Sequence, residues 1–203
     1  MNPGLFKLVA NYHSDYTLQQ VKDLIEQGAD PNYLSEPDSY GGRSFILDLV
    51  VRNNLETTKY LVSQGADPLH VSPNGDTPLR CAIRHGQVNI VKYLLKCGAK
   101  LTNEHLKEML SIFTGNPSDL YNMTKIMIEN KLDINTKDDN GQTLLFQAIG
   151  TENLKLLKLL VENGANVNIK DNENNTPLKY MIDVCEINNK KIEDLLIQHM
   201  AKK

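Results

Sequence analysis

Tryptophan is absent from this chain of 203 residues, and aromatic residues make up only 6% of it. Since hydrophobic residues still reach 40%, the core is expected to consist mainly of Leu, Ile, Val and Met. No stretch approaches the length of uncharged apolar sequence that spans a membrane. The first residues, Met1–Phe6, lack a basic segment followed by an apolar run, so no signal peptide is expected. We therefore expect a cytoplasmic protein.

Cysteine is also scarce, and Cys81, Cys97 and Cys185 are an odd number of scattered thiols that does not predict a disulfide framework. The five histidines show neither the i, i+4 pairing nor the Cys spacing of a zinc site. No glycine-rich phosphate loop and no Gly-x-Ser-x-Gly motif is present. The segment 138–141 lacks the acidic spacing of a calcium loop. The sequence thus predicts no metal, no cofactor and no enzyme.

Cys81 and His85 are one helical turn apart, so their side chains could touch as a nucleophile and its base do. Such a pair also needs an orienting group and a pocket, so a chance pair on a helix is the favoured interpretation. The net charge of −3 gives no general attraction for nucleic acid or an anionic membrane.

A short motif instead recurs along the chain. Gly-Ala followed by a polar residue starts at positions 28, 65, 98 and 164, with a degenerate copy at 131, so the spacings are 37, 33, 33 and 33. A second marker has the same period, because Thr77-Pro78-Leu79 and Thr176-Pro177-Leu178 lie 99 residues apart. Thr143-Leu144-Leu145 falls between them on the same grid, and Ser44-Phe45-Ile46 lies 33 residues before Thr77.

Two independent markers on one 33-residue grid resemble the ankyrin-repeat family, whose units have this period and a Thr-Pro-Leu-His-x-Ala motif. The resemblance extends from about Leu5 to His199. It implies a mainly α solenoid of about six helix-turn-helix units joined by short β-hairpin loops, in a single elongated domain. The units are expected at about 3–32 (N-terminal cap), 33–69, 70–102, 103–135 (degenerate), 136–168 and 169–203 (C-terminal cap).

The repeated residues also make sense from elementary structure. Thr77 suits a helix N-cap, Pro78 the first helical turn and Gly98 a left-handed C-cap. Stacked units bury their apolar stripes together, because each unit is too small to do so alone. The framework residues are Gly28, Gly65, Thr77, Pro78, Leu79, Gly86, Gly98, Thr143, Gly164, Thr176 and Pro177.

The pattern breaks in several places. The His that follows Thr-Pro-Leu in the family is missing from every unit, which puts the loop tethers that the resemblance implies in doubt. Four extra residues between the first two units predict an enlarged loop around Tyr40, either a tolerated insertion or a contact loop. In the fourth unit the first helix is expected to begin near Asn103, with a long link, Gly115–Asp119, before a helix over Met123–Asn130. This unit is predicted to be the least stable.

All four arginines fall in the second and third units, where Arg52 and Arg84 are expected at the ends of adjacent helices. One hypothesis is a cationic concave patch that binds an acidic segment of a partner. The alternative is that these arginines pair with Asp48, Asp76 or backbone carbonyls. The candidate partner-binding residues are Tyr40, Arg43, Asp48, Arg52, Arg80, Arg84 and His85.

The resemblance implies a non-catalytic scaffold or adaptor that binds another protein through its concave face and hairpin tips, acting as a monomer. The coding bias toward Asn and Lys makes a viral, bacterial or protist effector in a host cytosol one version of this role. The alternative is a regulatory subunit that holds and modulates an enzyme.

Overall fold

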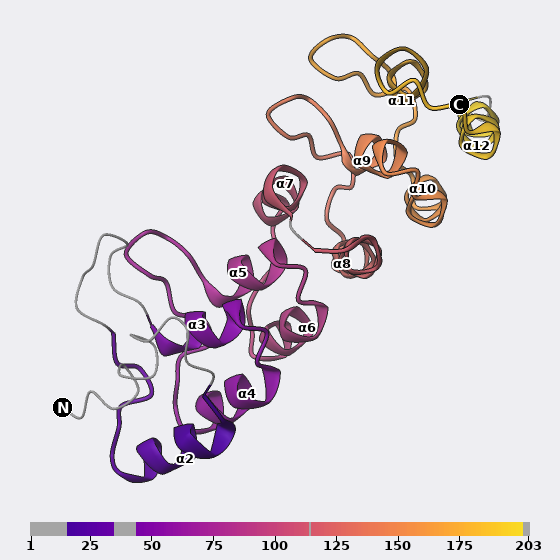
Figure 1. The fold of residues 1–203 in the computed structure, drawn as a ribbon. Coiled ribbons are helices and arrows are strands. Elements are labelled where there is room, and N and C mark those ends of the chain that lie inside the picture. The colour runs from indigo at the N-terminus through magenta and orange to yellow at the C-terminus, as the bar shows by residue number, and fades with distance from the viewer. Residues whose placement is uncertain (1–15, 35–43, 114, 201–203) are drawn as a thin grey trace. The chain divides into compact units, whose positions relative to one another are not determined.

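The computed structural model describes residues 16–34, 44–113 and 115–200, and short helices make up most of these ranges (Figure 1). The chain divides into two compact units, Met1–Lys100 and Leu101–Lys203, referred to below as unit 1 and unit 2. The described ranges contain no strand, and Leu34 and Ser44 form an isolated antiparallel bridge. The mainly helical class is confirmed, and the single-domain organisation stays a prediction.

The described part of unit 1 holds one helix of the first repeat and two complete helix pairs. The helix α3, which carries buried side chains, packs against its own partner helix α4 and against the next first helix, α5. The helix α2 packs against α4. The first helices therefore form one row and the second helices another. The helices are α2 (Leu18–Glu26), α3 (Phe45–Val51), α4 (Leu55–Ser63), α5 (Pro78–Arg84) and α6 (Val88–Lys96).

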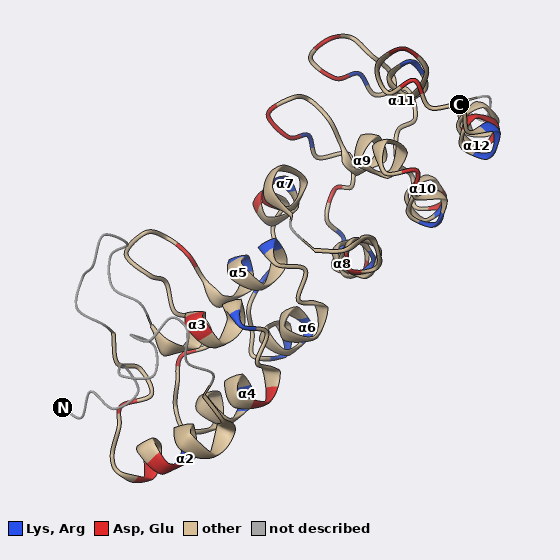
Figure 2. Ribbon diagram, in the orientation of Figure 1, with Lys and Arg blue, Asp and Glu red and all other residues tan. Residues whose placement is uncertain are grey.

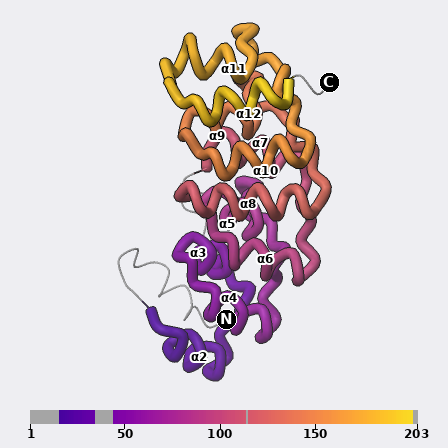
Figure 3. Tube along the Cα trace, turned by 90° about the vertical axis from the view of Figure 1, so that its right-hand side faces the viewer, coloured from indigo at the N-terminus to yellow at the C-terminus, as the bar shows by residue number. Residues whose placement is uncertain are grey.

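Unit 2 repeats this arrangement three times. The second helices α8, α10 and α12 lie side by side (Figure 3), and α9 packs against α11 and η1 in the row of first helices. The elements are α7 (Asn103–Ile112), α8 (Pro117–Glu129), α9 (Leu144–Gly150), α10 (Leu154–Glu162), α11 (Pro177–Lys179), η1 (Tyr180–Val184) and α12 (Lys190–Met200). Each helix pair falls within one of the repeats expected from the sequence.

The helix starts follow from capping residues. Thr77 and Thr176 each accept a hydrogen bond from the third helical N–H, and Pro78 and Pro177 occupy the first helical turn, as the sequence predicts. The expected start of α7 at Asn103 is also confirmed. The predicted long link before a helix at Met123 is wrong. Asn116 accepts hydrogen bonds from the N–H groups of residues 118 and 119, and α8 therefore begins at Pro117.

Described loops between successive repeats form tight turns closed by backbone hydrogen bonds. Ser72 N donates to Asp76 O at 2.9 Å, and Asp138 N donates to Gln142 O at 2.8 Å. The enlarged loop expected around Tyr40 lies outside the described residues. Hairpins without extended strands are sufficient here, because each loop only reverses the chain between two helices.

Asparagine side chains join successive loops where the family's histidine is missing. The amide of Asn32 donates to Gly65 O and accepts from Asp67 N, both at 2.8 Å. In unit 2, Asn135 accepts from Asn166 N at 2.7 Å. These bonds connect loops about one repeat apart, so loop tethers exist without the histidine.

The sixth repeat departs most from the regular geometry. Its first helix begins as the single turn α11 and continues as the π-helix η1, which widens the turn. Residues 185–189 then link η1 to α12. Within this repeat Met181, Ile192 and Leu196 are buried, while Ile182 and Ile197 are about half exposed. The sixth repeat thus leaves apolar side chains exposed on both of its helices.

Candidate partner-binding surfaces

The predicted arginine residues lie at one end of two helices that pack together in unit 1. Arg52 is the C-cap residue of α3, and Arg84 is the last residue of α5. His85 follows as the C-cap of α5, and partial burial together with the charge of Arg84 lowers its pKa. Tyr40 and Arg43, the other candidates from the sequence, lie outside the described residues.

Each of these arginines is held by an acceptor of its own chain. Arg52 Nε donates to Asp48 Oδ2 at 2.7 Å, and Arg84 donates to Asp76 Oδ1 at 3.1 Å. Arg80 donates to the backbone carbonyl of Gly75 at 3.1 Å. These contacts match the alternative interpretation, in which the arginines pair with acceptors of their own chain. The two carboxylates offset the positive charge of the patch.

Tyr16, which is not among the candidates from the sequence, binds the same carboxylate of Asp48 as Arg52 does. Its hydroxyl donates to Asp48 Oδ2 at 2.7 Å, and the guanidinium carbon of Arg52 lies 5.2 Å from its ring centroid. Burial, followed by the hydrogen bond to the Asp48 carboxylate, raises the pKa of the Tyr16 hydroxyl far above its usual value. Tyr16 precedes the first recognisable motif, so the repeat pattern gives no signal for it.

Exposed apolar side chains occur at the loops of unit 1. Leu34 is 42% exposed, Leu69 46% and Val71 62%. Leu34 and Val71 lie 37 residues apart, which is the spacing of Gly28 and Gly65, and they therefore occupy equivalent places in successive loops. In unit 2 the position of Val71 is taken by lysine, at 137 and 170. Unit 1 thus presents an apolar rim where unit 2 presents a charged one.

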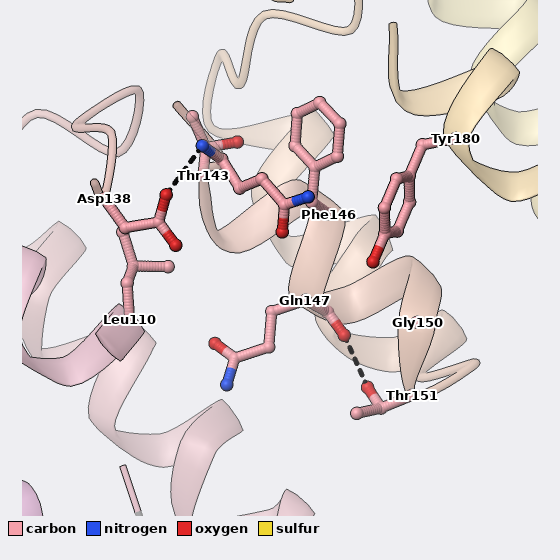
Figure 4. A pocket seen from close by; sticks show the side chains of 9 residues that line it. Leu110, Asp138, Thr143, Phe146, Gln147, Gly150, Thr151 and Tyr180 are labelled. Carbon is pink, nitrogen blue, oxygen red and sulfur yellow. Dashed lines mark hydrogen bonds between the residues drawn. The ribbon is translucent and has the colours of Figure 1, made fainter. Parts of the chain in front are cut away.

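A shallow pocket of about 230 Å³ opens on the first helices of unit 2 (Figure 4). We call it the α9 pocket, because α9 supplies its floor. Phe146 and Tyr180 form one wall, with their ring centroids 5.3 Å apart in an edge-to-face contact. Its lining residues are Leu110, Asp138, Gln142, Thr143, Phe146, Gln147, Gly150, Thr151 and Tyr180.

Two hydrogen-bond acceptors of the α9 pocket are placed for a ligand, the carboxylate of Asp138 and the side-chain oxygen of Gln147. Asp138 Oδ1 accepts from Asn140 N and Gln142 N, at 2.9 and 2.8 Å, which fixes its carboxylate at the mouth. Gln147 Oε1 is buried, and no described residue donates a hydrogen bond to it. The loops before α9 and α11 carry further acidic residues (Figure 2). The pocket therefore favours a group that donates hydrogen bonds.

Within the residues that the structure describes, no group of three or more His, Cys, Asp or Glu side chains is placed to hold a metal ion. Over the same ranges, none of the helices combines the length and the apolar character needed to cross a bilayer.

Paired antiparallel helices, hairpin turns and a 33-residue period define a helical repeat protein. The chain belongs to the ankyrin-repeat family. The family model described as ankyrin repeats (3 copies) matches residues 8–105 and 110–203. Ankyrin repeats are in general modules of protein–protein interaction.

Comparisons with individual proteins agree with this family. The chain is 30% identical over 84 residues to human transient receptor potential cation channel subfamily A member 1, a match that covers 41% of this chain and 8% of the channel. The ankyrin repeat domain of human ASB11 superposes with a TM-score of 0.68 at 24% identity, covering 90% of this chain and 78% of that one. The ankyrin repeat protein EF0377 gives a TM-score of 0.69 at 24% identity and covers 98% of both chains.

Proposed function

We propose that this protein is a non-catalytic adaptor that binds a segment of a partner protein in the α9 pocket of unit 2. The observation that carries this proposal is Gln147 Oε1, a buried acceptor that faces the pocket without a donor. A buried polar atom that lacks a partner costs on the order of 1–3 kcal/mol. A ligand that donates to this oxygen recovers that free energy.

The chemistry of the pocket favours a lysine or arginine side chain of the partner. Leu110 and Phe146 offer apolar contact for the stem of such a side chain. Asp138 and Gln147 offer acceptors for its charged end. A volume of about 230 Å³ suits one side chain rather than a whole ligand. A basic residue in the α9 pocket does not conflict with an acidic segment at unit 1, which remains a separate prediction.

Three finer roles are compatible with the same pocket. The partner of a simple adaptor is a second scaffold, that of an effector is a host protein, and that of a regulatory subunit is an enzyme whose rate changes on binding. A cytoplasmic site of action and a monomeric state belong to the proposal. The three cysteines support the cytoplasmic location, because all of them are free thiols.

Selection from a library of random peptides displayed on phage tests the proposal directly. The full chain is the bait, and the affinities of selected peptides are measured by isothermal titration calorimetry. We expect enrichment of Lys or Arg, and a loss of affinity of about tenfold in Gln147→Leu, which removes the acceptor but keeps the size of the side chain. Asp138→Asn is expected to weaken binding and reduce its dependence on salt.

The matched control is Gln64→Leu, the same chemical change at an exposed residue of unit 1. It is expected to leave peptide affinity unchanged. Peptides that bind Gln147→Leu and Asp138→Asn as tightly as the original chain would place the site elsewhere, and the apolar rim of unit 1 would then be examined by Val71→Asp.

A further inference from the structure

The sixth repeat exposes a residue that is buried at the equivalent place in other repeats. Val50, Ile149 and Ile182 occupy one grid position, since 149 − 50 = 99 and 182 − 149 = 33. Val50 and Ile149 are fully buried, whereas Ile182 is 50% exposed. Val50 belongs to α3, which packs against α5, and Ile149 belongs to α9, which packs against η1. No described first helix packs against η1 on the side opposite α9, and Ile182 is exposed there.

The second helix of the repeat shows the same difference. Ile192 and Leu196 of α12 are buried four residues apart, as are Leu156 and Leu160 of α10, so Ile197 corresponds to Val161. Val161 is 6% exposed and Ile197 is 45% exposed. Both helices of the sixth repeat therefore leave an apolar residue uncovered on the side where a further helix pair would stack.

A hollow of about 300 Å³ lies between these two helices. Ile182 and Ile187 line it together with Glu186 and Glu193, and Ile197 lies one helical turn beyond Glu193. We define the open face as Ile182, Glu186, Ile187, Glu193 and Ile197. It joins residues of η1, the following link and α12, and it is separate from the α9 pocket.

Charge indicates what kind of group covers the open face. Glu193 pairs with Lys190 at 3.2 Å, but neither Asp183 nor Glu186 forms an ion pair with any described residue. The residues that line the hollow include Glu186 and Glu193 but no Lys or Arg. The border of the apolar hollow is thus acidic, and its complement is basic.

We infer that the open face docks a basic amphipathic helix of a partner protein, seated where a further repeat would stack. The helix presents an apolar stripe to Ile182, Ile187 and Ile197 and a Lys or Arg to Glu186. The inference does not depend on the α9 pocket, because the two surfaces share none of their residues.

The probe is a synthetic amphipathic helix of about 18 residues, with Leu on one face, Lys along its flanks and a single Trp. Since the protein has no Trp, the fluorescence of the peptide reports its binding to the full chain without background. We expect saturable binding, weakened at least about tenfold by Ile182→Asp, because an apolar contact is replaced by a charge. The same change at Val51, which is also 50% exposed but lies in unit 1, is expected to have no effect.

A second variant tests the charge. Glu186→Lys is expected to weaken the basic peptide and to improve binding of a peptide with Glu in place of every Lys. The inference is overturned if the original chain does not bind the basic peptide, or if Ile182→Asp binds it equally well. It is also overturned if sedimentation shows that the chain dimerises and that Ile182→Asp abolishes the dimer, because a second copy is then the occupant.

Discussion

Gly141 and Asn172 approach each other so closely that a Cβ added to Gly141 would lie 2.8 Å from the backbone nitrogen of Asn172. Asn172 N donates to Asn140 O at 3.0 Å, and its side-chain amide donates to Asp139 O at 2.9 Å. Two successive loops of unit 2 are therefore held together by backbone contacts that leave no room for a side chain. In addition, the φ of Gly141 is +75°, in the left-handed region.

Gly141→Ala is expected to destabilise the protein by about 2–3 kcal/mol, since it adds both a steric clash and left-handed strain. Gly164→Ala is the matched control, because Gly164 also has a positive φ but no atom within 4 Å of an added Cβ. We expect it to lose only about 1 kcal/mol. Urea unfolding of both variants measures the difference, and equal losses would show that strain alone matters.

Lys131→Gly is expected to stabilise the protein by about 1 kcal/mol. Lys131 has a φ of +60° at the place where the other repeats have Gly, as at Gly98 with +100°. The same substitution at Lys125, inside α8, is expected to destabilise by about 1 kcal/mol. A lower urea midpoint for Lys131→Gly than for the original chain would contradict this account.

The fourth repeat is expected to open before its neighbours. Its second helix, α8, is followed by Lys131 in a left-handed conformation, and its first helix, α7, begins without a Pro at the first turn. Native-state hydrogen exchange, followed residue by residue, measures this local stability. Exchange that is slowest over residues 103–135 would show the opposite order.

Stability above pH 10 is expected to depend on Tyr16. Burial and the Asp48 carboxylate raise the pKa of its hydroxyl in the folded state, whereas the unfolded chain releases this proton near the ordinary value of 10.0. The unfolded state therefore binds fewer protons above that pH, and the free energy of unfolding falls as pH rises. Between pH 9 and 11, the original chain is expected to lose stability more steeply than Tyr16→Phe, as followed by urea unfolding with circular dichroism. Identical slopes would mean that the pKa of this hydroxyl is the same in the folded and the unfolded chain.

The predicted binding site for an acidic partner at Arg52 and Arg84 is tested with a Glu-rich peptide and two variants, one expected to lower the affinity and one expected to raise it. The double variant Arg52→Glu, Arg84→Glu is expected to lose affinity, with its fold checked by circular dichroism. Asp76→Asn weakens the pair that now holds Arg84, so it is expected to raise affinity about two- to threefold. If neither variant changes binding, the arginines serve only the contacts within their own chain.

Much of the fold follows from the sequence, because the 33-residue spacing of Gly-Ala and Thr-Pro-Leu is a local signal repeated along the chain. The start of α8 was missed although Asn116-Pro117 uses the same cap and proline as Thr77-Pro78. The neighbouring Gly115 and the absence of a Thr-Pro-Leu motif made this segment resemble a link. A capping device has to be recognised by its chemistry as well as by its place on the grid.

The candidate surfaces could not be predicted to the same extent. Tyr16 meets Asp48 across 32 residues, and no spacing rule joins them. Ile182 resembles any apolar framework residue in the sequence, and only the helices packed around it decide that it is exposed. Gln147 is a polar residue on a first helix like many others until its oxygen is seen to lack a donor.

The loop tethers have a consequence for how the chain acquires its structure during synthesis. Asn32 to Gly65, Lys137 to Lys170 and Asn172 to Asp139 each join residues 33 positions apart. Because each of these tethers joins neighbouring repeats, the hydrogen bonds of a repeat can form as soon as the next repeat has left the ribosome. The protein is therefore expected to fold progressively while it is still being translated.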